Sequence, residues 1–83
     1  MTPRLAPHVG LRWQAAREEW LLVMPEAVVV LNQTAAAVLR RCDGVRDVDD
    51  IVASLKEEYD DVDAGDVADL LQDLANKRVV ELT

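Results

Sequence analysis

Side chains able to act as a nucleophile or to transfer a proton near neutral pH are few, because the chain of 83 residues has one cysteine and one histidine. A reactive thiolate needs an electropositive, partly open site with a base beside it. Arg40 and Arg41 adjoin Cys42 in the sequence, but Cys42 shares the apolar face of a predicted helix and the arginines do not. His8 has no catalytic or ligating partner nearby in the sequence. We therefore expect a buried, unreactive thiol and an exposed or locally bonded histidine.

Acidic side chains gather at Asp47, Asp49 and Asp50, which invites comparison with a calcium loop. The EF-hand pattern also requires a central Gly and a final Glu, and both are missing here. Helix capping explains the cluster better, since Asp47 can cap a helix and the next carboxylates favour the positive end of its dipole. The chain has no Gly-rich phosphate loop, no G-x-S-x-G and no H-E-x-x-H. We predict a protein without enzyme activity, metal or cofactor.

The feature of the sequence that remains as a candidate binding site is a strand at the edge of a sheet. Residues 27–31 contain an uninterrupted apolar and mostly β-branched run after Pro25, which is typical of a strand. Asn32 can cap a following helix, with Thr34 as a second candidate, and Gly44 can close that helix in the left-handed conformation. The apolar face of this helix is expected to contain Ala35, Val38, Leu39 and Cys42.

Two further strands are predicted before this one. Residues 9–13 alternate between apolar and polar side chains, and residues 20–24 form a second apolar run. The short links predict a three-stranded antiparallel meander in which residues 27–31 form an edge. Trp13 and Trp20 are in phase with apolar neighbours, so we expect them to pack in the core. Residues 1–7 have two prolines and no period, so we expect a flexible arm.

Two more helices follow, each with an apolar stripe at helical spacing. Asp63 is the predicted cap of the last helix, with Asp66 at the capping-box position. The stripes are Val48, Ile51, Val52, Leu55 and Tyr59, and then Val67, Leu70, Leu71 and Leu74. Val79, Val80 and Leu82 can form a short final strand. The expected fold is a single α+β domain over residues 1–83, winged-helix-like, with a three-stranded antiparallel sheet followed by a three-helix bundle.

The charge distribution limits the choice of partner. The net charge is −7, and the acidic excess lies in residues 42–83, whereas residues 1–41 are weakly basic. An acidic half repels a phosphate backbone but attracts a basic protein surface. The N-terminal residues lack the apolar stretch of a signal peptide, and no apolar run is long enough to span a membrane. We expect a cytoplasmic protein that binds neither nucleic acid nor membrane.

Short motifs spread over nearly the whole chain carry a resemblance to a known family. They are Pro3-Arg4-Leu5, Val9, Leu11-Arg12, Trp20-Leu21-Leu22, Pro25-Glu26, Val30-Leu31-Asn32, Thr34-Ala35, Leu39, Cys42-Asp43-Gly44 and Asp66-Val67. This set resembles the PqqD family of pyrroloquinoline quinone (PQQ) biosynthesis proteins, and the block from Pro25 to Gly44 is its most specific part. One departure is Lys77-Arg78-Val79, where the family often has Gly-Trp-Val.

The resemblance implies a peptide chaperone. Proteins of this family bind the leader of the precursor peptide PqqA and present it to PqqE, a radical S-adenosylmethionine enzyme that cross-links a Glu and a Tyr of the core peptide. The leader is understood to add as a strand to the third strand, beside the third helix. The resemblance therefore implies that the peptide-binding residues are Val28, Val29, Val30, Leu31, Val67, Leu70, Leu71 and Leu74. Part of the helix stripe must also face the core.

Two other interpretations stay open at this point. A winged helix can bind DNA, but its recognition helix needs basic and amide side chains, and the third helix carries Asp66, Asp69 and Asp73 instead. An open apolar strand can also pair with its own copy, which would give a homodimer with an isologous contact.

Overall fold

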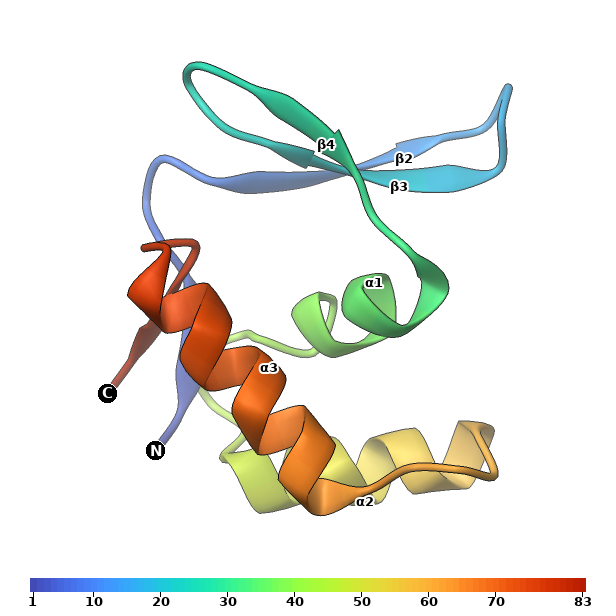
Figure 1. Cartoon of the computed structure of the whole chain (residues 1–83), viewed down its shortest axis with the longest axis vertical. Coiled ribbons are helices and arrows are strands. Elements are labelled where there is room, and N and C mark those ends of the chain that lie inside the picture. The colour runs from blue at the N-terminus through green and yellow to red at the C-terminus, as the bar shows by residue number, and fades with distance from the viewer.

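The computed structural model describes residues 1–83 and contains five strands and three helices (Figure 1). Strands β2 (Gly10–Gln14), β3 (Glu19–Val23) and β4 (Val28–Val30) form an antiparallel sheet with β3 in the middle. The helices that follow are α1 (Gln33–Leu39), α2 (Val48–Glu58) and α3 (Ala64–Asn76). The predicted α+β class, the three-stranded antiparallel sheet and the position of β4 at its edge are confirmed.

A second, two-stranded sheet joins the two ends of the chain. Strand β1 (Pro3–Leu5) pairs antiparallel with β5 (Val80–Leu82), and Arg4 forms a further bridge with Asp43. The expected flexible arm over residues 1–7 is therefore wrong for Pro3–Leu5. Pro3 is fully buried, and as the first residue of its strand it costs the ladder no donor. The predicted final strand is confirmed.

Capping side chains begin each helix where the sequence predicts. Asn32 Oδ1 accepts the Ala35 N–H at 2.7 Å, and Asp47 forms a reciprocal capping box with Asp50 at the start of α2. Asp63 accepts the Asp66 N–H at 3.1 Å at the start of α3. Each bond satisfies a backbone donor that the first helical turn leaves without a partner.

Helix α1 ends sooner than its apolar stripe suggests. It stops at Leu39, so Cys42 does not belong to the helix, although it is buried. The N–H groups of Arg41 and Cys42 bond to carbonyls only three residues back, which tightens the chain into a turn. Gly44 adopts the expected left-handed conformation with a φ of 78°, but the prediction that it closes the helix is wrong, because the C-cap of α1 is Arg40; the Gly44 N–H donates to the Pro3 carbonyl instead.

The core lies between the inner face of the sheet and the three helices. Its most enclosed side chains include Val38 and Leu39 of α1, Ile51 of α2 and Leu71 of α3. The prediction that both tryptophans pack in this core is wrong: Trp13 is 48% exposed, and Trp20 is half-buried and is not among the side chains packed against the core. Trp13 lies opposite Trp20 near the turn of the β2–β3 hairpin, beside a pocket that is also lined by α1.

Candidate functional site

Strand β4 has an open edge, because it pairs with β3 on one side and with no strand on the other. Its three valines are the most exposed apolar run of the molecule, at 60% for Val28, 43% for Val29 and 59% for Val30. An unpaired, apolar edge is a template for pairing with another chain unless it is covered or charged. No charged residue lies in this strand.

The backbone hydrogen bonds define which groups of β4 are free. Met24 and Ala27 exchange two bonds, and the Leu31 N–H donates to the Trp20 carbonyl at 2.9 Å. Hydrogen-bonded and non-hydrogen-bonded pairs alternate in an antiparallel ladder, so Val29 bonds to its partner Leu22. The N–H and C=O groups of Val28 and Val30 therefore point outward, whereas those of Val29 and the N–H of Leu31 are engaged with β3.

The side chains of β4 divide between the two faces of the sheet. Val29 lies opposite Leu22, which is buried in the core, so Val29 lies on the face that looks toward the helices. Val28 and Val30 lie on the outer face, opposite Val23 and Leu21. Of the valines predicted to bind, two offer backbone groups to the open edge and one offers a side chain to the inner face.

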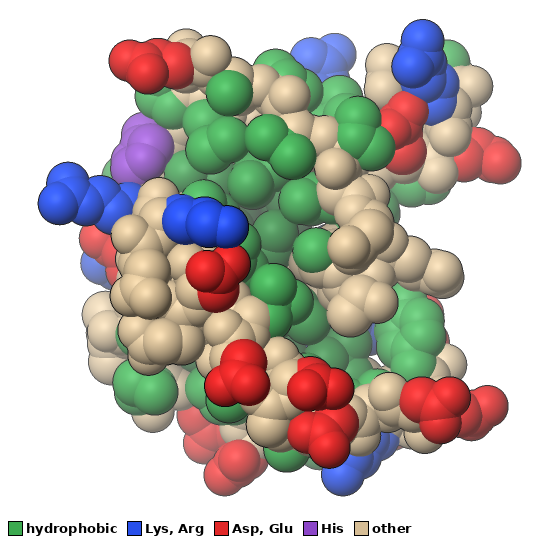
Figure 2. All heavy atoms as spheres, viewed as in Figure 1, with side chains coloured by type: hydrophobic (Ala, Val, Ile, Leu, Met, Phe, Trp, Pro, Cys, Tyr) green, Lys and Arg blue, Asp and Glu red, His purple; other side chains and the backbone are tan.

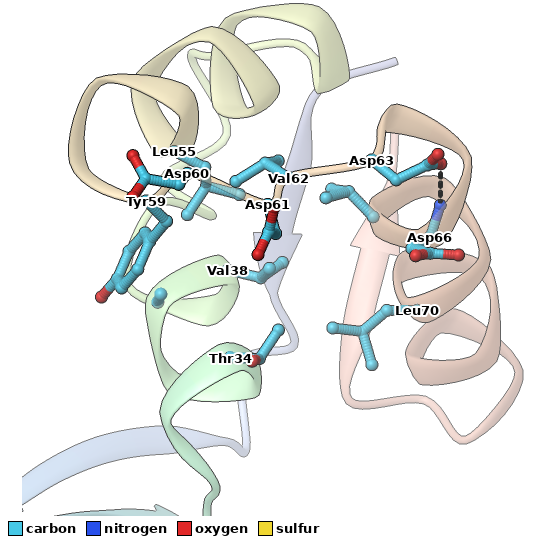
Figure 3. A pocket seen from close by; sticks show the side chains of 12 residues that line it. Thr34, Val38, Leu55, Tyr59, Asp60, Asp61, Val62, Asp63, Asp66 and Leu70 are labelled. Carbon is cyan, nitrogen blue, oxygen red and sulfur yellow. Dashed lines mark hydrogen bonds between the residues drawn. The ribbon is translucent and has the colours of Figure 1, made fainter.

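A pocket of about 420 Å³ opens between α1 and α3 and under the link from α2 (Figure 3). Val38 of α1 and Leu70 of α3 line it from opposite helices. The other lining residues are Thr34, Ala37, Leu55, Tyr59, Asp60, Asp61, Val62, Asp63, Asp66 and Val67. Figure 2 shows hydrophobic side chains that continue from the sheet down the hollow between the helices.

The stripe predicted on α3 divides between core and pocket. Leu71 is 1% exposed and belongs to the core, and Val67 is buried while also lining the pocket. Leu70 is half-buried and lines the pocket, whereas Leu74 packs against the core and does not reach the pocket. The structure thus brings Val67 and Leu70 into the candidate site and leaves Leu71 and Leu74 outside the pocket.

Several pocket residues were missed by the sequence analysis. They are Thr34, Ala37 and Val38 of α1, Leu55 and Tyr59 around the end of α2, and Val62 of the following link. Val38, Leu55 and Tyr59 were recognised as apolar-face positions. The sequence did not show that α1 and α3 leave a space between them, because this depends on how the helices pack.

Carboxylates surround the pocket on the side of the α2–α3 link. Asp60, Asp61, Asp63 and Asp66 all line it, and none of them forms an ion pair within the chain. Figure 2 shows acidic side chains grouped near the lower end of the hydrophobic hollow. The site therefore combines an apolar interior with a negatively charged border, an arrangement that suits an apolar segment flanked by cations.

Cys42 and Asp43 lie away from this pocket, and their titration has local causes. Burial, with a smaller contribution from the Asp43 charge, raises the pKa of Cys42 to about 11, and its Sγ donates to the Val38 carbonyl. The N–H groups of Arg46 and Val45 donate to Asp43 Oδ1 at 2.9 Å and hold the pKa of that carboxyl below its usual value.

The structure contains no group of three or more His, Cys, Asp or Glu side chains that could hold a metal ion. None of its helices has the length and apolar character needed to cross a bilayer.

Comparison with known structures places the fold in one class. The chain is similar to the PqqD part of Methylobacterium extorquens PqqCD, described as a stand-alone recognition element for ribosomally synthesized and post-translationally modified peptides (TM-score 0.71, 38% identity, 96% of this chain and 88% of that one). It is also similar in fold to lasso peptide synthetase B1 complexed with a leader peptide (TM-score 0.75, 22% identity, 99% and 100% covered). The fold is thus that of the peptide recognition elements.

The sequence comparisons identify the family. The family model described as coenzyme PQQ synthesis protein D (PqqD) matches residues 19–80, and the chain belongs to the PqqD family. A relative called PqqA binding protein from Xanthomonas oryzae pv. oryzae is 38% identical over 96% of this chain and 90% of its own length. A relative of the same name from Methylococcus capsulatus is 38% identical over 68% of this chain, and the match covers 60% of that protein.

Proposed function

We propose that this chain is a peptide chaperone of PQQ biosynthesis that binds the leader of the precursor peptide PqqA by strand addition to β4. The leader adds to the free edge beside Val28 and Val30 and directs apolar side chains toward the hollow between α1 and α3. The chain then presents the peptide to the radical S-adenosylmethionine enzyme PqqE in the cytoplasm. In this proposal the chain is not an enzyme, and its arrangement is winged-helix-like.

The observation that carries the proposal is the outward direction of the Val28 and Val30 backbone groups. Strand addition derives affinity from main-chain hydrogen bonds and specificity from pockets for alternate side chains. The edge supplies two donors and two acceptors that the chain itself leaves free. The names of the relatives, which refer to PqqA binding, support the choice of peptide.

The pocket supplies the second requirement. Side chains of an added strand alternate between the two faces of the sheet, so every second one shares the inner face with Val29. That face looks toward α1, whose Val38 lines the pocket together with Leu70 of α3. The pocket volume of about 420 Å³ is ample for one or two apolar side chains. The aspartates along the link favour a leader that carries Lys or Arg next to these apolar residues.

The proposal is tested by titrating isotope-labelled protein with synthetic PqqA leader while backbone amide signals are followed. Val30→Pro removes one outward donor without removing a β3–β4 bond, and we expect about a 3- to 10-fold weaker affinity. Val30→Thr keeps the donor and the β-branched shape, so it should bind nearly as the parent does. Equal affinity of both variants and the parent, with both variants folded, would contradict strand addition at this edge.

A second copy of the chain is a competing occupant of the same edge. Pairing of β4 with its symmetry mate would give a homodimer and would block the peptide. Molecular mass measured across a concentration series, with and without the leader, distinguishes the two occupants. A monomer that binds the leader supports the proposal, whereas a dimer that ignores it supports the alternative. The acidic α3 argues against DNA as the partner, because Asp66, Asp69 and Asp73 are all exposed.

A further inference from the structure

A second pocket, of about 440 Å³, lies between α1 and the turn end of the β2–β3 hairpin. It contains both tryptophans of the chain, together with Leu31, Gln33, Ala36 and Arg40 on one side and Glu18, Glu19, Glu58 and Tyr59 at its border. Ala37 and Tyr59 line both this pocket and the first one. No other lining residue is common to the two pockets.

The tryptophan pair forms the aromatic part of this second pocket. Trp13 and Trp20 lie opposite one another across β2 and β3, with ring centroids 5.5 Å apart and planes tilted by 54°. The Arg40 guanidinium lies 5.0 Å from the centroid of the Trp20 ring, within the range of a cation–π contact. The chain therefore already places one guanidinium on this aromatic surface, and the Trp13 ring is left partly open to solvent.

The charge around the aromatic pair is negative. Glu18, Glu19 and Glu58 line the pocket against the single cation Arg40, and Glu18 and Glu19 form none of the salt bridges of the chain. Glu58 is paired with Arg41. An aromatic face bordered by free carboxylates attracts a cation through two interactions, one with the ring quadrupole and one with the carboxylate charge. Arginine fits best, because its planar guanidinium can stack on indole and still donate hydrogen bonds at its edge.

We infer that the Trp13–Trp20 pocket is a docking site for an exposed arginine side chain of a partner protein. The charge and the aromatic surface select the guanidinium, and none of the β4 residues Val28–Val30 lines the pocket. This inference does not depend on the proposed function, because the pocket stands whether or not a peptide adds to β4. If both hold, one domain can contact a peptide and a second protein at the same time.

The chain offers a direct readout, because its two tryptophans are both in this pocket and give the only indole N–H signals. We would titrate the labelled chain with N-acetyl-arginine amide and, separately, with N-acetyl-citrulline amide, which has nearly the same shape without the charge. The expected result is a saturable shift of both indole signals with the arginine compound and a clearly weaker response with the citrulline compound. Absence of any indole shift, or equal shifts with both compounds, would overturn the inference.

Substitutions in the pocket test which side chains contribute to arginine binding. Trp13→Leu should weaken arginine binding about threefold as read from the Trp20 signal, the usual size of one exposed cation–π contact. The double change Glu18→Gln and Glu19→Gln should weaken it by a similar factor, since it removes charge but keeps shape. Glu26→Gln is the matched control, because Glu26 lies at the opposite end of β3 and should leave affinity unchanged. The same weakening per charge removed in Glu26→Gln and in the double change would reduce the effect to net charge and overturn a specific site.

The same samples separate this inference from the proposed function. PqqA leader binding is read from the backbone amides of Val28 and Val30, which do not line the second pocket, and arginine binding from the indole signals. Weaker leader binding in Val30→Pro with an unchanged arginine response leaves the second pocket in place. Weaker arginine binding in Trp13→Leu, read from the Trp20 signal, with unchanged leader binding shows that the two sites are independent.

Discussion

Met24 and Ala27 exchange two backbone hydrogen bonds at the turn between β3 and β4, and this pair decides which groups of β4 face the open edge. Counting along the strand from Ala27, the backbone groups of Val29 and the N–H of Leu31 bond to β3. The backbone groups of Val28 and Val30 point to the open edge. Proline substitutions at neighbouring positions of one strand should therefore act on different properties.

The first prediction compares Val29→Pro with Val30→Pro by urea unfolding. Val29→Pro removes the donor to Leu22 and leaves that carbonyl without its partner, so we expect it to lower the free energy of unfolding by about 1–3 kcal/mol. Val30→Pro removes no bond within the sheet and should cost clearly less. The reverse order of the two losses would mean that the register of β4 is shifted by one residue.

The second prediction concerns Leu70 and Leu71, which are neighbours in α3 with different surroundings. Leu71→Ala should lower the free energy of unfolding by about 2–5 kcal/mol, because it leaves a cavity in the core. Leu70→Ala should cost about 1 kcal/mol and should instead weaken PqqA leader binding, because Leu70 lines the pocket. Calorimetric titration with the leader, after unfolding curves have shown that each variant is folded, checks both halves. Leader affinity unchanged in Leu70→Ala would remove the α1–α3 pocket from the binding site.

The sequence was sufficient to predict the elements whose signals are local. The caps Asn32, Asp47 and Asp63 lie directly before helices, and the Gly44 conformation follows from the absence of a side chain. The edge position of β4 followed from the short links of a meander. Each of these features depends on residues within a few positions of one another, so the chain encodes it without reference to distant segments.

Features that depend on distant segments were not predictable in the same way. The strand at Pro3 forms only because β5 lies beside it, some 80 residues later in the chain. Trp13 has the alternation of a core residue, but the placement of the hairpin on α1 leaves a pocket beside it rather than packed side chains. Leu70 and Leu71 both belong to the apolar stripe of α3, and only the position of α1 decides which of them lines a pocket.

The third prediction concerns Cys42 and pH. Because burial raises the pKa of the folded thiol to about 11 from an ordinary value of 9.0, the unfolded chain loses this proton at lower pH than the folded chain does. The stabilisation is therefore complete below pH 9.0 and is lost as the pH rises toward 11. We expect thermal unfolding temperatures to fall over this interval, and to fall less in Cys42→Ala.

A thiol reagent at about pH 8 should react with Cys42 far more slowly than with free cysteine, since little thiolate is present. Rapid reaction in the folded state would contradict the burial.

The last prediction concerns the two-stranded sheet that joins the ends of the chain. Pro3 is fully buried, its carbonyl accepts the Gly44 N–H at 3.0 Å, and the Thr2 N–H donates to Thr83 at 2.8 Å. Deletion of residues 1–5 should therefore lower the free energy of unfolding by about 2–4 kcal/mol, the value expected for loss of one fully buried apolar side chain, Pro3, and one half-buried side chain, Leu5.

Arg4→Ala is the control for this deletion, because it removes only the exposed ion pair with Glu81. The expected cost of the control is about 0–1 kcal/mol. Urea unfolding of both variants beside the parent chain distinguishes a structural strand from a dispensable arm. If the deletion costs no more than Arg4→Ala, then β1 contributes little to folding, because β5 and Gly44 would be held in place by the helices alone.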